Sequence, residues 1–211
     1  MSSAQLGWPA DQHRFSKRVL DICGASALLV LTSPVLAAAA VSILIDTGRP
    51  ILFRQERIGQ HGRIFRMSKF RTMRRNAQYE GTGLFSYEGD SRITRSGKWL
   101  RISSIDELPQ LLNVMHGDMS LVGPRPPVVG ELGEFEDFTG ALYYRFKLKP
   151  GITGLAQVSG RNNLDWDEKV ILDTQYLDSY GRLGVREDIR ILFATAVAVL
   201  AMRNTIEQPK E

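Results

Sequence analysis

The sequence has little of what several classes of protein need. Its 211 residues include a single cysteine, Cys23, which excludes an internal disulfide framework and fits a reducing compartment or a membrane. Its three histidines, His13, His61 and His116, are scattered, so the ligand spacing of a zinc site is missing. Neither a Walker loop nor a dinucleotide-binding fingerprint is present, since Gly81-Thr82-Gly83 lacks the third glycine and the strand–helix context. These absences exclude disulfide scaffolds, zinc enzymes and the common nucleotide-binding loops.

The chain also lacks an internal repeat and a linker that would divide two domains. At 211 residues it is long enough for one sizeable core and too short for two full domains. We expect an N-terminal tail over residues 1–12, a membrane segment over 13–48 and a catalytic region over 49–211. The last two should form one functional domain.

Positive charge is concentrated in the first half of the chain. Residues 1–103 hold 16 Lys/Arg against 7 Asp/Glu and the remainder 11 against 16, so the net charge of +4 combines +9 with −5. The densest run, Arg54 to Arg75, contains eight basic residues opposed only by Glu56. Such a run attracts phosphate in nucleic acid, in lipid headgroups or in a phosphorylated substrate. A solvated basic face is the plainer alternative.

One long apolar segment, Val19 to Ile45, is interrupted by Thr32-Ser33-Pro34. Its length would suffice for a membrane span, but Pro34 removes a backbone donor and predicts a kink. The hydroxyl of Ser33 or Thr32 can then satisfy the freed carbonyl groups, which makes the kink tolerable in lipid.

The flanks of this segment carry equal positive charge. Arg14, Lys17 and Arg18 precede it, and Arg49, Arg54 and Arg57 follow it. Because basic flanks mark the cytoplasmic side, both ends are expected in the cytoplasm, which predicts a re-entrant helical hairpin. The main competing interpretation is a cleaved signal peptide, since Ala37–Ala40 resembles a cleavage site, although the apolar pattern continues to Ile45. A buried helix of a soluble core is less consistent with this length.

The remaining pattern predicts a compact, mainly helical region. We expect a β-hairpin from Ile51–Arg57 and Arg63–Met73, mainly helical structure over Lys98–His116, Glu131–Phe146 and Trp166–Tyr180, and loops over Asn76–Ser91 and Pro150–Gly154. The last apolar run, Ile191–Met202, is too short to cross a bilayer and is either core or an interfacial helix. The fold class is therefore α+β, mainly helical: a single membrane-associated catalytic domain with a re-entrant membrane helix kinked at Ser33-Pro34, a small β-hairpin and amphipathic interfacial helices.

Two adjacent carboxylates, Asp106 and Glu107, lie at a predicted helix start. Ser104 with Glu107 matches a capping box, and the alternative starts the helix at Pro109 with the pair just outside. Either arrangement favours ionised carboxylates and bound phosphate at the positive end of the helix dipole. One carboxylate can act as a nucleophile or metal ligand while the other moves a proton. Acidic residues in a first helical turn are also ordinary structural features.

Three basic residues are candidates for binding phosphate beside this pair. Gly123-Pro124-Arg125-Pro126 holds Arg125 on a stiff backbone, and arginine offers a planar fork for phosphate. Arg161 lies on a second glycine-containing loop, and Lys69 is the third candidate. Either of the last two alone would be interpreted as a surface salt bridge. Carboxylate and phosphate oxygens together suit Mg²⁺.

At this point the chain resembles the small monotopic phosphoglycosyl transferases, also called bacterial sugar transferases. The resemblance covers nearly the whole chain. It rests on Lys17-Arg18-Val19-Leu20-Asp21, Ser33-Pro34, Lys69-Phe70-Arg71-Thr72-Met73, Ser104-Ile105-Asp106-Glu107-Leu108-Pro109-Gln110-Leu111, Asn113-Val114, Gly117-Asp118-Met119-Ser120, Val122-Gly123-Pro124-Arg125-Pro126, Pro150-Gly151-Ile152-Thr153-Gly154 and Gly160-Arg161-Asn162.

The resemblance implies transfer of a sugar-1-phosphate from a UDP-sugar to polyprenol (undecaprenyl) phosphate. It also implies a re-entrant membrane helix bent at Ser33-Pro34 and a catalytic pair, Asp106 and Glu107, working with Mg²⁺. Larger members carry an added N-terminal multi-span region, which we expect this chain to lack. The loop Asn76–Ser91 and the tail after Asp188 match less clearly and are expected to bear on the choice of sugar.

The expected mechanism is ping-pong. Asp106 would attack the sugar-bearing phosphorus, release UMP and bind Mg²⁺, while Glu107 would move a proton or position the metal. Arg125, Arg161 and Lys69 would hold phosphate or nucleotide.

The expected site of action is the cytoplasmic face of the bacterial inner membrane, on a bilayer with anionic headgroups. Downstream glycosyltransferases would use the product, and a homodimer is left open. A nucleic-acid-binding protein would explain the basic run without the apolar segment. A membrane scaffold would explain the apolar segment without the Gly-Pro-Arg-Pro turn, so nucleic acid is not expected as a partner.

Overall fold

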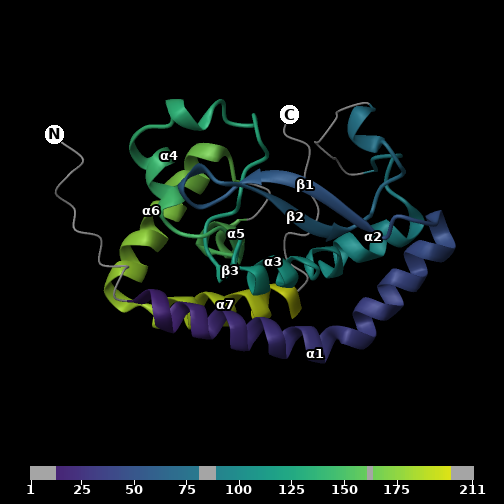
Figure 1. The fold of residues 1–211 in the computed structure, drawn as a ribbon, viewed down its shortest axis with the longest axis horizontal. Coiled ribbons are helices and arrows are strands. Elements are labelled where there is room, and N and C mark those ends of the chain that lie inside the picture. The colour runs from purple at the N-terminus through teal and green to yellow at the C-terminus, as the bar shows by residue number, and fades with distance from the viewer. Residues whose placement is uncertain (1–12, 81–88, 161–163, 201–211) are drawn as a thin grey trace.

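The computed structural model describes residues 13–80, 89–160 and 164–200 (Figure 1). The helices in these ranges are α1 (Arg14–Thr47), α2 (Arg95–Ile102), α3 (Gln110–His116), α4 (Gly140–Tyr144), α5 (Leu155–Ser159), α6 (Trp166–Leu183) and α7 (Val185–Leu200). The strands are β1 (Leu52–Ile58), β2 (Ile64–Phe70), β3 (Ser120–Val122) and β4 (Gly151–Thr153). This mainly helical arrangement with small two-stranded sheets confirms the predicted fold class.

Helix α1 is continuous through Pro34 and bends along its length (Figure 1). Proline cannot donate a hydrogen bond to the carbonyl group four residues earlier, which belongs to Val30. The Ser33 hydroxyl donates to that carbonyl oxygen instead, at 2.8 Å, and Thr32 donates to Leu28 at 2.7 Å. The predicted use of these hydroxyl groups is confirmed. Since side chains of the helix itself satisfy the carbonyl groups near the proline, the helix can bend without leaving an unsatisfied carbonyl group in lipid.

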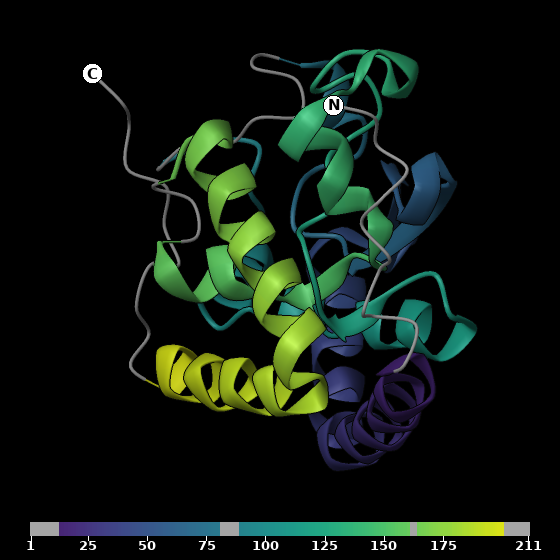
Figure 2. The same cartoon turned by 90° about the vertical axis from the view of Figure 1, so that its left-hand side faces the viewer.

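The rest of the protein covers little of α1. An 18-residue window of this helix has a mean hydropathy of 2.4, and only 11% of the window is buried. Both views place α1 and α7 along the same side of the molecule (Figure 1, Figure 2). Helix α7 also exposes apolar side chains on its outer face, including Ile189, Phe193 and Val197. An exposed apolar surface of this size marks an interaction with a membrane or a partner.

Strands β1 and β2 form the predicted antiparallel hairpin, paired from Leu52 with Phe70 to Ile58 with Ile64. Side chains alternate between the faces of a strand, so Phe65, Met67 and Lys69 share one face. Phe65 and Met67 are buried in the main core cluster, which also contains residues of α3, α6 and α7. Lys69 continues this inward face at the end of the strand, where the site begins.

The main core also holds β3 and β4, which pair in parallel through Ser120 with Gly151 and Val122 with Thr153. The prediction of a loop over Pro150–Gly154 is therefore wrong, because this segment supplies a short strand. Its glycines permit the pairing: a Cβ on Gly151 would clash with the backbone of Gly123. The small sheet places the turn that follows β3 at the surface of the core.

Two predicted helices are interrupted. Between Lys98 and His116 the chain forms α2, a 3₁₀ turn over Ile105–Glu107 and α3, because Ser104 adopts a left-handed conformation with a φ of 57°. The segment Glu131–Phe146 contains only 3₁₀ turns and α4, since Gly133 and Gly140 have φ values of 93° and 56°. Its aromatic residues still pack together, in a cluster of Phe135, Phe138 and Phe146. The spacing predicted the apolar contacts correctly and the long helix wrongly.

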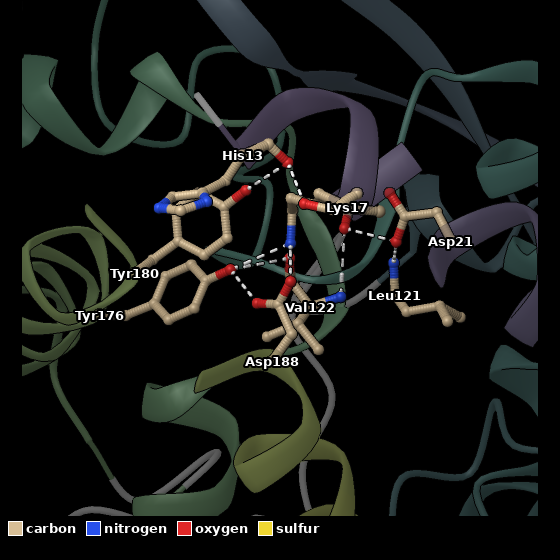
Figure 3. A network of polar contacts seen from close by, with 10 residues as sticks. His13, Lys17, Asp21, Leu121, Val122, Tyr176, Tyr180 and Asp188 are labelled. Atoms are coloured by element: carbon tan, nitrogen blue, oxygen red, sulfur yellow. Dashed lines mark hydrogen bonds and ion pairs between the residues drawn. The ribbon is translucent and has the colours of Figure 1, made fainter. Parts of the chain in front are cut away.

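The N-terminal end of α1 is bound to the core by buried polar groups (Figure 3). The Lys17 ammonium donates to Asp188 at 2.7 Å, to the Tyr176 hydroxyl at 3.1 Å and to the Val122 carbonyl oxygen at 2.9 Å. One turn further, Asp21 accepts from the Leu121 amide at 2.9 Å and from the Ser120 hydroxyl at 2.8 Å. Burial raises the pKa of the Asp188 carboxyl, and the Lys17 charge opposes that shift. The network joins α1 to β3, α6 and α7.

Replacing Lys17 should therefore destabilise the fold strongly. Lys17→Met leaves the buried Asp188 carboxylate without its cation, at a cost of about 3–5 kcal/mol. The measurement is thermal unfolding of the detergent-solubilised protein. Lys98→Met, at an exposed position of α2, is the control and should stay within about 0.5 kcal/mol of the native protein. Equal unfolding midpoints for the two variants would show that the network does not hold α1.

Candidate active site

The two carboxylates predicted as catalytic lie between α2 and α3. Asp106 and Glu107 occupy the 3₁₀ turn, and α3 begins at Gln110, after Pro109. The capping box is not formed, because Ser104 has a left-handed backbone and makes no side-chain cap hydrogen bond. The alternative, with the pair outside a helix that starts near Pro109, is confirmed. Asp106 is buried, with 9% of its surface exposed.

Two of the predicted basic residues meet at Glu107. The Lys69 ammonium lies 2.9 Å from Glu107 Oε1, and the Arg125 Nη2 atom lies 3.2 Å from the same oxygen. The exposed fractions of the Lys69, Arg125 and Glu107 side chains are 18%, 32% and 12%. The prediction that Lys69 and Arg125 lie beside the acidic pair is therefore met in the geometry. Arg161 lies outside the described residues.

The charges in this site act on one another because water is largely excluded. Burial lowers the pKa of Lys69, while the negative charges of Glu107 and Asp106 oppose that shift. The pKa of Arg125 is raised, chiefly by the charge of Glu107, and Asp106 adds to this effect. The charges of both carboxylates therefore affect the pKa values of both cations. Two fixed cations can bind the oxygens of a phosphate that approaches Asp106.

The turn that carries Arg125 is bound through its carbonyl groups. Proline has no amide hydrogen, so Pro124, Pro126 and Pro127 leave the turn few donors of its own. The carbonyl oxygens of residues 122 and 124 to 127 all accept from other parts of the chain. Their donors are Lys17 and Tyr176 for Val122, the Gly151 amide for Pro124 at 3.0 Å, Arg145 for Arg125 at 2.7 Å, Arg57 for Pro126 at 2.9 Å and the Ile58 amide for Pro127 at 3.1 Å.

Arg57 and Arg145 are site residues that the sequence did not single out. Arg57 comes from β1, and burial lowers its pKa to about 10, with the charge of Arg125 contributing. Arg57 belonged to the predicted basic run, and its pairing with Phe65 in the hairpin puts it on the face that carries Lys69. Arg145 is 1% exposed and pairs with Asp173 of α6 at 2.7 Å. Its only sequence signal was that it is one of two charged residues, with Lys147, in the otherwise apolar or aromatic stretch Leu142–Leu148.

The residues present fit a magnesium ion held mainly by substrate. The described part of the chain has no group of three or more His, Cys, Asp or Glu residues able to enclose a metal. Magnesium usually binds one or two carboxylates together with phosphate oxygens and water, which suits Asp106 as a protein ligand. The charges that act on one another here are balanced. They are Lys69, Arg57 and Arg125, and Asp106, Glu107 and Glu131. An added diphosphate would leave net negative charge for a divalent cation to neutralise.

The buried Asp106 and its neighbour Glu107 lie beside two fixed cations, on a body with an exposed apolar helix. This combination suits a membrane-associated protein that binds anionic groups. The model of the bacterial sugar transferase family matches residues 12–202, and the chain belongs to that family. The match includes α1, so the apolar helix is part of the family domain.

Curated relatives agree with this assignment. The chain is 45% identical over 199 residues to the galactosyl transferase CpsE of Streptococcus agalactiae, covering 89% of this chain and 43% of that protein. It is 40% identical over 201 residues to the undecaprenyl-phosphate galactose phosphotransferase of Salmonella typhimurium, covering 89% and 41%. A third relative is the UDP-glucose:undecaprenyl-phosphate glucose-1-phosphate transferase of Caulobacter vibrioides, 39% identical, with 89% and 71% covered. The chain thus spans less than half the length of the first two relatives.

The turn that carries Arg125 should loosen when Gly123 gains a side chain. In Gly123→Ala the new Cβ would clash with the Lys149 carbonyl oxygen and approach the Gly151 amide nitrogen at 2.9 Å, so β3 and β4 must separate. Hydrogen–deuterium exchange of a peptide covering residues 119–128 should become faster. Lys98→Met, at an exposed position of α2, is the control and should leave this peptide unchanged. Native exchange in Gly123→Ala would contradict the close contact.

Proposed function

We propose that this chain transfers a sugar-1-phosphate from a UDP-sugar to undecaprenyl phosphate and releases UMP. The observation that carries the proposal is the buried Asp106 next to Glu107, with Lys69 and Arg125 both on Glu107 Oε1. The names of two relatives include undecaprenyl-phosphate sugar transfer, and one of them names UDP-glucose. Family membership supports the reaction class, and the geometry supports the roles of the residues.

The first half-reaction uses Asp106 as the nucleophile. A carboxylate oxygen of Asp106 forms a bond to the sugar-bearing phosphorus of the donor. The bond from that phosphorus to the bridging oxygen breaks, and UMP leaves with the electron pair. Lys69 and Arg125 bind phosphate oxygens and offset the repulsion between two anions, which is the main barrier to this attack. The product is a phosphosugar-aspartyl intermediate.

The second half-reaction returns Asp106 to its starting state. An oxygen of the acceptor phosphate attacks the same phosphorus, and the Asp106 carboxylate leaves. Glu107, held by two cations, takes a proton from the acceptor phosphate or orients it. When bound, Mg²⁺ supplies positive charge to the donor phosphates, with Asp106 as its proposed protein ligand. Arg161 remains a proposed contact to phosphate or nucleotide.

The exposed apolar surfaces of α1 and α7 support a position at the membrane. We place the protein in the bacterial inner membrane as a monotopic protein with the site on the cytoplasmic face. In this arrangement α1 enters the bilayer, bends at Ser33-Pro34 and returns. The site then lies at the depth of the lipid phosphate. The acceptor phosphate therefore meets the catalytic residues already positioned at the membrane surface and need not leave the lipid to reach them. A homodimer and contacts with downstream glycosyltransferases remain predictions.

The reaction is tested by UMP release from detergent-solubilised protein with Mg²⁺, a panel of UDP-sugars and undecaprenyl phosphate. Asp106→Asn should abolish turnover and leave no radiolabelled phosphosugar on the protein, because the amide cannot act as the nucleophile. Thermal unfolding of the variant checks that it is folded. Near-native activity in Asp106→Asn would overturn the nucleophile assignment. If the folded native protein released no nucleotide product with any nucleotide sugar, the transferase proposal would be overturned.

The membrane path is tested by cysteine labelling in a Cys23→Ser background. Phe15→Cys and Arg49→Cys place single thiols at exposed positions on either side of the bend in α1. For a re-entrant helix, a membrane-impermeant maleimide in the periplasm should label neither thiol in intact cells and both after permeabilisation. Labelling of one thiol in intact cells would establish a full span instead.

A further inference from the structure

Arg145 binds the backbone of the residue that reaches the catalytic pair. Its Nη2 atom donates to the Arg125 carbonyl oxygen at 2.7 Å, although the two residues are 20 positions apart in the chain. The side chain of Arg125 in turn contacts Glu107 at 3.2 Å. A single buried guanidinium therefore fixes the point from which the Arg125 side chain extends.

The orientation of the Arg145 guanidinium is fixed from three sides. Asp173 Oδ2 accepts from Nε at 2.9 Å and lies 2.7 Å from Nη2, so Nη2 serves both Asp173 and Arg125. The guanidinium carbon also lies 5.3 Å from the ring centre of Phe146 and 5.2 Å from that of Trp166. Such stacking on aromatic rings suits the planar arginine group. The fork cannot rotate without losing several contacts together.

Stability alone does not explain this arrangement. The attraction within a buried ion pair is largely offset by the free energy lost when the two charges leave water. Apolar side chains of similar volume are therefore often equally stabilising. In addition, the Arg145 Nη1 atom is buried and has no hydrogen-bond partner among the described residues. An unsatisfied buried donor carries a cost of its own. The feature that only arginine supplies at this position is the directed contact to the Arg125 carbonyl oxygen.

We propose that Arg145, oriented by Asp173, is a positioning residue that sets the Arg125 side chain against Glu107 for phosphate binding. This inference rests on the proposed function, because it assigns Arg125 to the phosphate of the substrate. The hydrogen bonds and ion pair of Arg145 go to Asp173 and to the Arg125 backbone, and neither Asp106 nor Glu107 is among its partners in the described residues. It acts only through Arg125, and this separates its role from a purely structural one.

The test replaces the ion pair without leaving a buried charge. Arg145→Met/Asp173→Leu removes both charges at similar volume, so the fold is retained while the contact to the Arg125 carbonyl is lost. UMP release is then measured over a range of UDP-sugar concentrations. The expected result is a fall in kcat/KM of about 100-fold, the size of effect that a misplacement of about 1 Å produces.

The same double change in an Arg125→Ala background separates positioning from stability. If Arg145 acts through Arg125, the further loss there should be within about 3-fold, because the residue it positions is already missing. Equal losses in the two backgrounds would overturn the proposal. Native kcat/KM in the Arg145→Met/Asp173→Leu variant would also overturn it.

A structure of the variant gives a readout that does not depend on activity. The expected result is that the Arg125 guanidinium has left Glu107 Oε1. A retained contact would overturn the proposal. If the native protein releases no UMP with any donor, the proposed function fails, and the structure of the variant still decides whether Arg145 positions Arg125.

Discussion

The site depends on how a proline-rich turn is bound to the core. A backbone segment normally uses its amide hydrogens and its carbonyl oxygens to join its surroundings, and buried groups of both kinds must be paired. Residues 124, 126 and 127 are prolines and have no amide hydrogen. The carbonyl groups must therefore do the binding, and donors from β1, β4, α1, α6 and the turn at Arg145 meet them. All of these elements together therefore fix the position of Arg125.

This arrangement joins the membrane helix to the chemistry. Lys17 of α1 donates to the Val122 carbonyl oxygen, which directly precedes the turn, and its ammonium also pairs with Asp188 of α7. At its other end, α1 is capped by Arg71, which donates to the carbonyl oxygens of Thr47 and Gly48. Arg71 follows Lys69 by two residues in the chain. Both cations on Glu107 thus lie within three residues of contacts that hold α1, so the position of α1 and the geometry at Glu107 are set together.

Local chemistry made part of this arrangement predictable from the sequence. The Ser33-Pro34 pair predicted both the bend and its hydroxyl contact, because the proline rule acts within one helical turn. The β-hairpin followed from alternation around a glycine-rich turn, and the acidic pair was placed correctly beside Lys69 and Arg125. In each case the information lies within a few residues or in a dense motif.

Contacts between distant segments were not predictable in this way. The parallel pairing of β3 with β4 involves three residues in each strand, too few for a periodic pattern. The spacing of Phe135, Phe138 and Leu142 satisfied a helix, yet two left-handed glycines divide that segment while the same side chains still pack together. The pairing of Arg145 with Asp173 spans 28 residues, and each partner alone resembles an ordinary charged residue. Such pairs become visible only when the fold brings them together.

The electrostatic balance of the site explains why these distant contacts matter. In the proposed reaction the Asp106 carboxylate approaches a phosphorus surrounded by negative oxygens, so cations must be in place before the substrate arrives. Flexible lysines and arginines would turn toward bulk water or the nearest carboxylate at each encounter. Here Lys69 extends from a paired strand and Arg125 from a turn bound at its carbonyl groups, and both already lie on Glu107. Glu107 thereby keeps the two cations oriented beside Asp106 while no phosphate is bound, and a phosphate that enters need only share them.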